Sequence, residues 1–112
     1  MANTFKNAYL DVTNSAQDLY TAPTDVGDVA IVLSLRVTNV DGTASDDVSV
    51  EIVDSDTTTK AFIASTLAVP ADSSVEIAGT SKIVLEAGDK IQVTGAAASG
   101  DLEVFASILE IT

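Results

Sequence analysis

Apolar residues recur at alternate positions over much of this 112-residue chain. The two longest such runs are Val29, Ile31, Leu33, Leu35 and Val37, and then Leu102, Val104, Ala106 and Ile108. Successive side chains of a β-strand point to opposite faces, so a period of two is typical of strands. No segment of ten or more residues shows the 3.6-residue period of an amphipathic helix. The chain is therefore predicted to be all-β.

Both runs also carry apolar residues on their second face. Ala30 and Val32 interleave with the first run, and Phe105, Leu109 and Ile111 interleave with the second. Strands in the middle of a sheet that are covered on both sides show this pattern. Each run is therefore predicted to be a central strand, the first covered on both faces only at its start. Phe62 and Phe105 are predicted to lie in the core.

Turn residues divide the rest of the chain into short apolar segments. The candidate strands are 5–12, 17–21, 48–53, 60–64, 66–69, 74–77, 82–85 and 91–94. Many short strands with regular turn signals favour two antiparallel sheets packed face to face. Residues 1–112 are predicted to form a single antiparallel β-sandwich domain of jelly-roll or immunoglobulin-like type, with eight or nine strands. Residues 1–10 form either an N-terminal arm or an edge strand.

Two turns have a specific chemistry. Gly88 and Asp89 lie between the apolar residues Leu85 and Ile91, which predicts a hairpin. The pair Asp41-Gly42 suits a type I′ turn, and the polar residues that follow it suggest a longer loop.

The composition lacks the residues on which most catalytic mechanisms depend. The chain contains neither Cys nor His, which removes thiolate nucleophiles, disulfides and the commonest general base. Its Ser residues lack both a base and a nucleophile motif. A glycosidase needs two carboxylates across a cleft, but the five Glu residues lie at polar positions of strands or turns: Glu51, Glu76, Glu86, Glu103 and Glu110. We expect no enzyme activity and no cofactor.

The many Asp residues raise the possibility of a calcium site. The best candidates are Asp54, Ser55 and Asp56 with Thr57 and Thr58, and Asp41 with Asp46 and Asp47. Neither spacing matches a helix–loop–helix calcium loop, which requires Gly at its sixth position and an acid at its twelfth. Solvated loop acids that discourage edge pairing are the favoured interpretation, and no metal is expected.

The charge limits the partners. The chain carries 17 acidic and 5 basic residues, a formal net charge of −12, and the cations are scattered singly. Nucleic acids and anionic membranes attract clustered Lys and Arg, so neither is an expected partner. The start of the chain has no signal-peptide pattern, and no apolar run approaches the roughly 20 residues that span a bilayer. We expect a protein that is made and kept in soluble form, without a secretion signal.

The order of several short motifs resembles a known family. These motifs are Tyr20-Thr21-Ala22-Pro23, the strand before Thr38-Asn39, Val69-Pro70-Ala71-Asp72, Leu85-Glu86-Ala87-Gly88-Asp89 and the closing strand from Leu102. The pattern is similar to that of the small β-sandwich virion proteins of tailed bacteriophages, especially marine ones. Within that family the chain most resembles capsid decoration, or cement, proteins.

The resemblance implies a non-catalytic protein that binds the major capsid protein and copies of itself, as a homotrimer, and stabilises the shell. An acidic protein would be repelled by packaged DNA, which places it on the outer surface of the virion. The alternatives are a tail, neck or fibre component with a receptor or glycan surface, an adhesion or carbohydrate-binding module, and an unrecognised enzyme. Phe5, Lys6 and Tyr9 are the candidate partner-binding residues, because Ala2 to Leu10 suits strand addition to a neighbour or to the shell.

Overall fold

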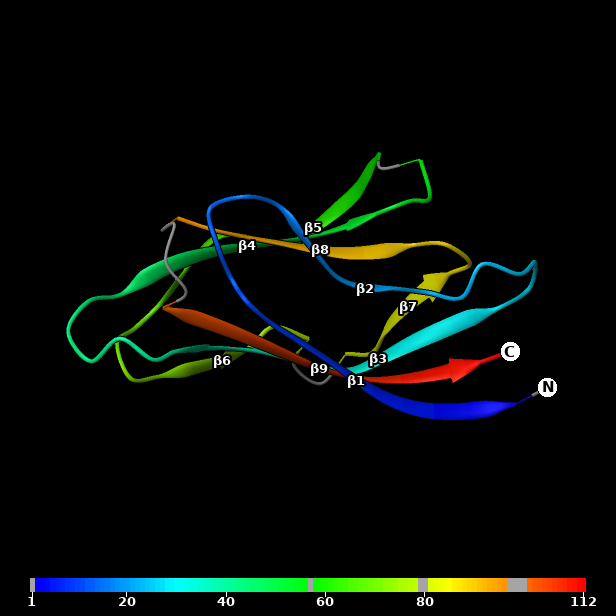
Figure 1. Ribbon diagram of the computed structural model, residues 1–112, viewed down its shortest axis with the longest axis horizontal. Coiled ribbons are helices and arrows are strands. Elements are labelled where there is room, and N and C mark those ends of the chain that lie inside the picture. The colour runs from blue at the N-terminus through cyan, green and yellow to red at the C-terminus, as the bar shows by residue number, and fades with distance from the viewer. Residues whose placement is uncertain (1, 57, 79–80, 97–100) are drawn as a thin grey trace.

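The computed structural model describes residues 2–56, 58–78, 81–96 and 101–112. These residues form nine β-strands and no helix, which confirms the predicted all-β class. The strands are β1 (Asn3–Asp11), β2 (Gln17–Thr21), β3 (Val29–Asn39), β4 (Asp46–Val53), β5 (Thr59–Val69), β6 (Ser74–Glu76), β7 (Ile83–Glu86), β8 (Lys90–Gly95) and β9 (Leu102–Ile111). Figure 1 shows them aligned along the long axis, with both ends of the chain at one end of the molecule.

The strands pair in a nested order. β1 pairs with β9, β2 with β8, β3 with β6 and β7, and β4 with β5, all antiparallel. The chain thus folds back on itself as one long hairpin whose turn joins β4 to β5. When this hairpin rolls up, β3 also pairs with β9, and β4 with β8. The result is a jelly roll rather than an immunoglobulin-like sandwich.

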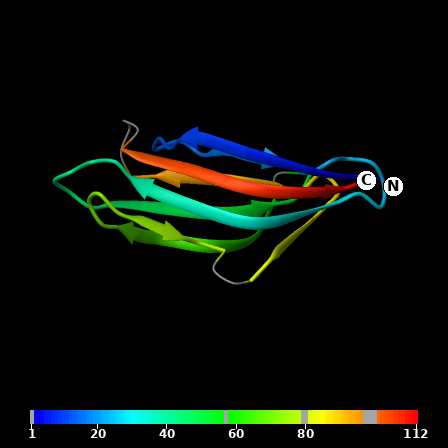
Figure 2. The same ribbon diagram turned by 90° about the horizontal axis from the view of Figure 1, so that it is seen from below.

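One sheet has the order β1-β9-β3 followed by β6 and β7, which pair with opposite ends of β3. The other sheet has the order β2-β8-β4-β5. The two sheets lie face to face, and Figure 2 shows the first sheet in front, with β1, β9 and β3 side by side. We call them the β1 sheet and the β2 sheet.

The core lies between the inner faces of the two sheets. Val37 of β3 and Ile108 of β9 meet Val50 of β4 and Ile91 of β8 there, all at most 1% exposed. Burying each such side chain stabilises the fold by about 1.5–3 kcal/mol. The predicted alternation of β9 is confirmed, since Leu102, Val104, Ala106 and Ile108 are all buried.

A register shift in β3 changes which residues face the core. The shift lies between Val32 and Ser34 in the pairing with β9. As a result Val32 and Leu35 both point into the core, although they are three residues apart. Ile31, which the alternation groups with Leu35, is instead only half-buried and lies on the outer face. The prediction that the alternating run Val29, Ile31, Leu33, Leu35 and Val37 shares one face of the strand is therefore wrong, because periodicity alone does not reveal a bulge.

The predicted break between residues 64 and 66 is not a strand boundary. β5 runs from Thr59 to Val69, and Thr66 within it has a φ of 52°. This left-handed residue accompanies the shifted register between Val48 and Val50 on the paired strand β4. β5 is thus one irregular strand rather than two short ones.

The segment Leu85–Ile91 turns as predicted, but it is not a hairpin. Gly88 has a φ of 80°, and the amide of Asp89 donates to the carbonyl of Glu86 over 3.0 Å. The strands on either side belong to different sheets, because β7 pairs with β3 whereas β8 pairs with β2 and β4. The turn therefore carries the chain across the sandwich.

β1 forms one edge of its sheet and pairs with β9 over its whole length without a register shift. Next to its first residue, Ala2 and Thr112 exchange both backbone hydrogen bonds, at 2.7 and 2.9 Å. Pairs of this kind alternate along an antiparallel ladder. The even-numbered residues of β1 therefore bond to β9, and the odd-numbered ones direct their N–H and C=O groups to the open edge.

Candidate functional site

A row of apolar side chains crosses the outer face of the β1 sheet. Phe5 lies opposite Leu109, Leu109 opposite Ile31, and Ile31 opposite Val84, so the row spans four neighbouring strands. Phe5 is 74% exposed and Val84 is 60% exposed, whereas Leu109 and Ile31 between them are half-buried. We call these four residues the apolar row.

A second row on the same face contains aromatic residues. Tyr9 lies opposite Phe105, and Phe105 lies opposite Arg36. Tyr9 is 75% exposed and Phe105 is 46% exposed. The two rings border a shallow hollow of about 420 Å³ that Thr38 also lines. The predicted core position of Phe105 is wrong, because this face of β9 is not covered by another layer.

Apolar side chains on one face mark a surface that favours contact with another molecule, because water leaves them when the contact forms. The apolar row and the aromatic row both belong to the β1 sheet. Phe62 is also 57% exposed, which corrects its predicted core position, but it lies on β5 of the other sheet. The outer face of the β1 sheet is thus the candidate interaction surface.

The three residues predicted to bind a partner do not share one face. Phe5 and Tyr9 both belong to the outer face of the β1 sheet, as their even spacing on a strand requires. Lys6 has the opposite orientation, and its ammonium lies 3.2 Å from a carboxylate oxygen of Glu110. The structure therefore places the two aromatic residues on one face of the sheet and the cation on the other.

Glu110 is the centre of a polar cluster at the end of the sandwich where the chain begins and ends. The residue is 8% exposed, and its carboxylate contacts Lys6 and accepts a hydrogen bond from the phenol of Tyr20. Burial, together with this bond to Glu110 and its charge, raises the pKa of Tyr20 well above its usual range. Lys6 and Tyr20 thus give the buried carboxylate of Glu110 its polar partners, and the cluster links β1, β9 and β2. Its role is structural.

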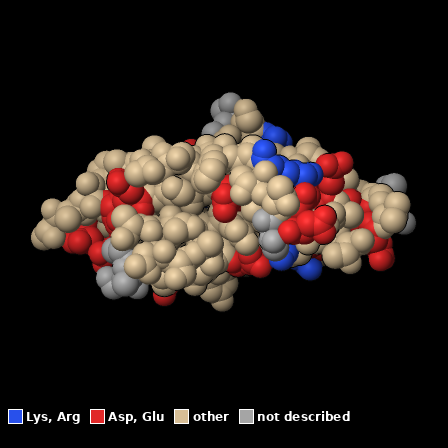
Figure 3. Space-filling model, turned by 90° about the horizontal axis from the view of Figure 1, so that it is seen from above, with Lys and Arg blue, Asp and Glu red and all other residues tan. Residues whose placement is uncertain are grey.

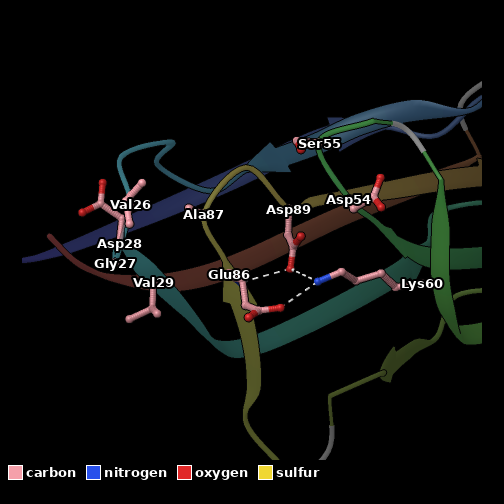
Figure 4. A pocket seen from close by; sticks show the side chains of 10 residues that line it. All are labelled: Val26, Gly27, Asp28, Val29, Asp54, Ser55, Lys60, Glu86, Ala87 and Asp89. Atoms are coloured by element: carbon pink, nitrogen blue, oxygen red, sulfur yellow. Dashed lines mark hydrogen bonds and ion pairs between the residues drawn. The ribbon is translucent and has the colours of Figure 1, made fainter.

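A second hollow, of about 450 Å³, lies beside the turn between β7 and β8. Figure 4 shows Lys60 of β5 reaching between Glu86 and Asp89, at 2.9 Å from a carboxylate oxygen of each. The hydrogen bonds to Asp89 and then to Glu86 raise the pKa of Lys60 to about 12. Asp89 also accepts the backbone N–H of Glu86 and is thereby part of the turn. A lysine held as a cation by two carboxylates is neither a base nor a nucleophile.

The acidic loops use their carboxylates to hold their own backbone. Asp54 accepts the amides of Asp56 and Thr58, and Asp41 accepts the amide and hydroxyl of Thr43. These bonds lower the pKa of Asp41. Within the described residues, no three acidic side chains come together in a geometry that would hold a metal ion. Thr57, named with the first calcium candidate, lies outside the described residues.

Charges are unevenly placed on the surface. Figure 3 shows the molecule from the side of the β2 sheet, where acidic side chains are spread from one end to the other and the cations lie among them in one half. In the described part of the chain, no helix has the length and apolar character needed to cross a membrane.

Comparison with known proteins supports the assignment of the fold, but it assigns the chain to no family. No family model matches the chain, and no curated protein matches its sequence. A chain of the Bacillus endospore appendages, a family of disulfide-linked pili, is similar over 99% of this chain and 87% of its own length, with a TM-score of 0.58 and 13% identity. A chain from the acid-stable capsid of Helicobacter pylori bacteriophage KHP30 is similar over 100% of this chain and 89% of its own length, with a TM-score of 0.56 and 14% identity.

A chain of the T13 particle of infectious bursal disease virus is also similar, over 97% of this chain, with a TM-score of 0.53 and 9% identity. This chain spans only 31% of that longer one. At such low identities these likenesses show a shared fold.

Proposed function

We propose that this chain is a non-catalytic structural protein of a tailed-bacteriophage virion, and that it decorates and stabilises the outer surface of the capsid. The observation that carries this proposal is the exposed apolar row on a domain whose net charge is −12. A strongly acidic domain needs no apolar face to stay soluble, whereas a protein that must adhere to a surface does need one.

The fold likenesses support an assembly role. A phage capsid chain and a pilus chain match this domain over nearly its whole length, and each comes from a repeating assembly. Because fold does not determine function, this support is by analogy. The two clusters of ionisable groups, around Glu110 and around Lys60, are held in structural bonds, which supports a non-catalytic role.

On this proposal the outer face of the β1 sheet contacts the major capsid protein. Phe5 and Tyr9 contribute exposed aromatic surface to the contact, and Lys6 contributes by fixing β1 to Glu110. Copies of the protein bind as a symmetric oligomer, for which the family resemblance implies a trimer. Several weak contacts in one oligomer then add up to firm binding.

A tail, neck or fibre component is the second candidate. The likeness to a pilus chain favours it, because tails and fibres are also elongated assemblies. Quantitative mass spectrometry of purified virions separates the two: a copy number comparable to that of the shell protein supports decoration. A copy number at least an order of magnitude lower supports the tail, and absence from the virion overturns both.

Two matched substitutions test the binding face. Val84→Asp places a charge in the apolar row, and Phe62→Asp places the same charge on the other sheet at a similarly exposed position. We expect Val84→Asp to lose binding to undecorated capsids and Phe62→Asp to keep it. Equal binding by both folded variants would overturn the assignment of this face. Deleting residues 2–8 is a poorer test, because it removes most of a fully paired strand.

A further inference from the structure

We propose that two copies of this chain pair through the open edges of β1, antiparallel and about a two-fold axis at Asn7, so that their β1 sheets join into one. The contact belongs to the protein in solution, before it binds the shell, where the family resemblance implies a trimer. It goes beyond the proposed virion role, which depends on the outer face and not on this edge.

The four sheet edges differ in how well they are protected from pairing. β2 has a register shift between Asp18 and Tyr20, and β5 has several shifts and the left-handed Thr66. The edge opposite β1 is divided into β6 and β7. Bulges, breaks and short strands are among the devices that stop edges from pairing, and an inward-pointing charge such as Lys6 is another. β1 has nine residues and no register shift, and so it lacks the first three.

The chemistry of β1 suits a second copy rather than a basic or acidic partner. On a chain of net charge −12, residues 3–10 contain a single charge, that of Lys6. Lys6 is already paired with Glu110 of its own chain. Two acidic domains therefore meet with least repulsion along this strand, and each has an identical row of unpaired N–H and C=O groups to offer.

Of the three registers that keep most of β1 paired, with the axis at Lys6, Asn7 or Ala8, only one places compatible side chains opposite each other. Odd-numbered residues carry the free backbone groups, so they must face odd-numbered residues of the second copy. An axis at Lys6 would place two ammonium groups directly opposite each other. An axis at Ala8 would place Phe5 opposite the carboxylate of Asp11. An axis at Asn7 avoids both and places Phe5 opposite Tyr9.

This register also extends the aromatic row. Tyr9 already lies beside Phe105 of its own chain, and pairing adds Phe5 of the second copy on its other side. Aromatic cross-strand neighbours of this kind stabilise a sheet. The odd-numbered residues from Asn3 to Asp11 would exchange about ten backbone hydrogen bonds between the two copies.

Cysteine cross-linking tests the register, because the chain has no cysteine of its own. Asn7→Cys places the two thiols at the axis, with Cα atoms about 5.5 Å apart. Asn3→Cys is the matched control on the same strand and face. In this register the two copies of residue 3 lie eight residues apart along the paired strands, which is about 27 Å. Both Asn side chains are exposed, so neither substitution disturbs the core. A short bis-maleimide is added to each purified protein.

We expect the Asn7→Cys protein to give a cross-linked dimer and the Asn3→Cys protein to give none. Sedimentation of the unmodified protein should give twice the 11.5 kDa mass of one chain, and Asn7→Lys should return it to one chain by placing two cations at the axis. A monomer, or a trimer without the Asn7 cross-link, would overturn the pairing. The proposed function is tested separately: whether or not the two copies pair, loss of capsid binding by Val84→Asp would support it.

Discussion

The phenol of Tyr20 on β2 donates a hydrogen bond to the carboxylate of Glu110 on β9, and so connects the two sheets across the end of the sandwich. Lys6 contacts the second oxygen of the same carboxylate from β1. Three strands from both sheets thus converge on one buried charge. A buried carboxylate is stable only with such partners, because it has lost its water.

Replacing Tyr20 by Phe should destabilise the protein by about 1.5 kcal/mol, because Glu110 then loses a donor. The pKa of Tyr20 is raised in the folded state, so the folded protein holds this proton at a pH where the unfolded chain releases it. The contribution is therefore complete below about pH 10 and declines above it. Urea unfolding measures the free energy of unfolding at about pH 8 and about pH 11. Between these two pH values, Tyr20→Phe should lose less of this free energy than the unmodified protein loses. An equal decline in both proteins would contradict this assignment.

The side chain of Glu76 supplies a hydrogen-bond acceptor to β3 at the gap between β6 and β7, where neither of these strands supplies one. Its carboxylate accepts the backbone N–H of Leu35 over 2.7 Å at the end of β6. Glu76→Ala should cost about 1–3 kcal/mol, because this N–H is left without a partner. Glu76→Gln keeps an acceptor and should cost less. Denaturant unfolding of the two variants provides the comparison, and equal losses would show that the bond is not what matters.

Leu35 and Phe62 test the division between core and surface. Leu35 is fully buried, whereas Phe62 is 57% exposed. Leu35→Ala should cost about 2–5 kcal/mol, because it leaves a cavity between the sheets. Phe62→Ala should change the free energy of unfolding by no more than about 0.5 kcal/mol. Thermal unfolding measures both, and a large loss for Phe62→Ala would mean that its ring is covered in solution.

Comparing Ala substitutions at Gly88 and Gly27 distinguishes the cost of backbone strain from that of steric contact. Both have a φ in the left-handed region, 80° and 90°, where a side chain costs about 1–2 kcal/mol. A Cβ atom on Gly88 would lie 3.0 Å from the Cβ of Ser55, whereas one on Gly27 would meet nothing within 4 Å. Gly88→Ala should therefore destabilise more than Gly27→Ala, and Ser55→Gly should remove the excess. If Ser55→Gly restores nothing, strain alone explains the loss.

Much of the local structure could be predicted from the residues. The alternation from Leu102 to Ile111 predicted a central strand, and β9 lies between β1 and β3 as expected. The positive φ of Gly88 and the turn at Asp89 also follow from local chemistry. Which strands pair did not follow, because β7 and β8 are joined by a tight turn and yet belong to different sheets.

The candidate site was predicted only in part. Phe5 and Tyr9 stood out as aromatic residues among small polar ones, and both are exposed. Val84 and Ile31 did not stand out, because an apolar residue on a strand is normally assigned to the core. The spacing of two between Leu109 and Ile111, next to the buried set, was a usable signal of a second apolar face. By itself such a pattern indicates burial on both sides, so it predicts the wrong environment for the outer face of β9.

The sequence by itself determined the all-β class, the alternation of β9, the acidic charge and the lack of Cys and His, because each depends on residue type and spacing along the chain. The tertiary structure decided the jelly-roll pairing, the bulge in β3, and which of two apolar faces is buried. Those outcomes depend on contacts between residues far apart in the chain, such as Phe5 with Leu109. A period of two shows that a strand has two faces, but only the packing of the sheets shows which face is left open.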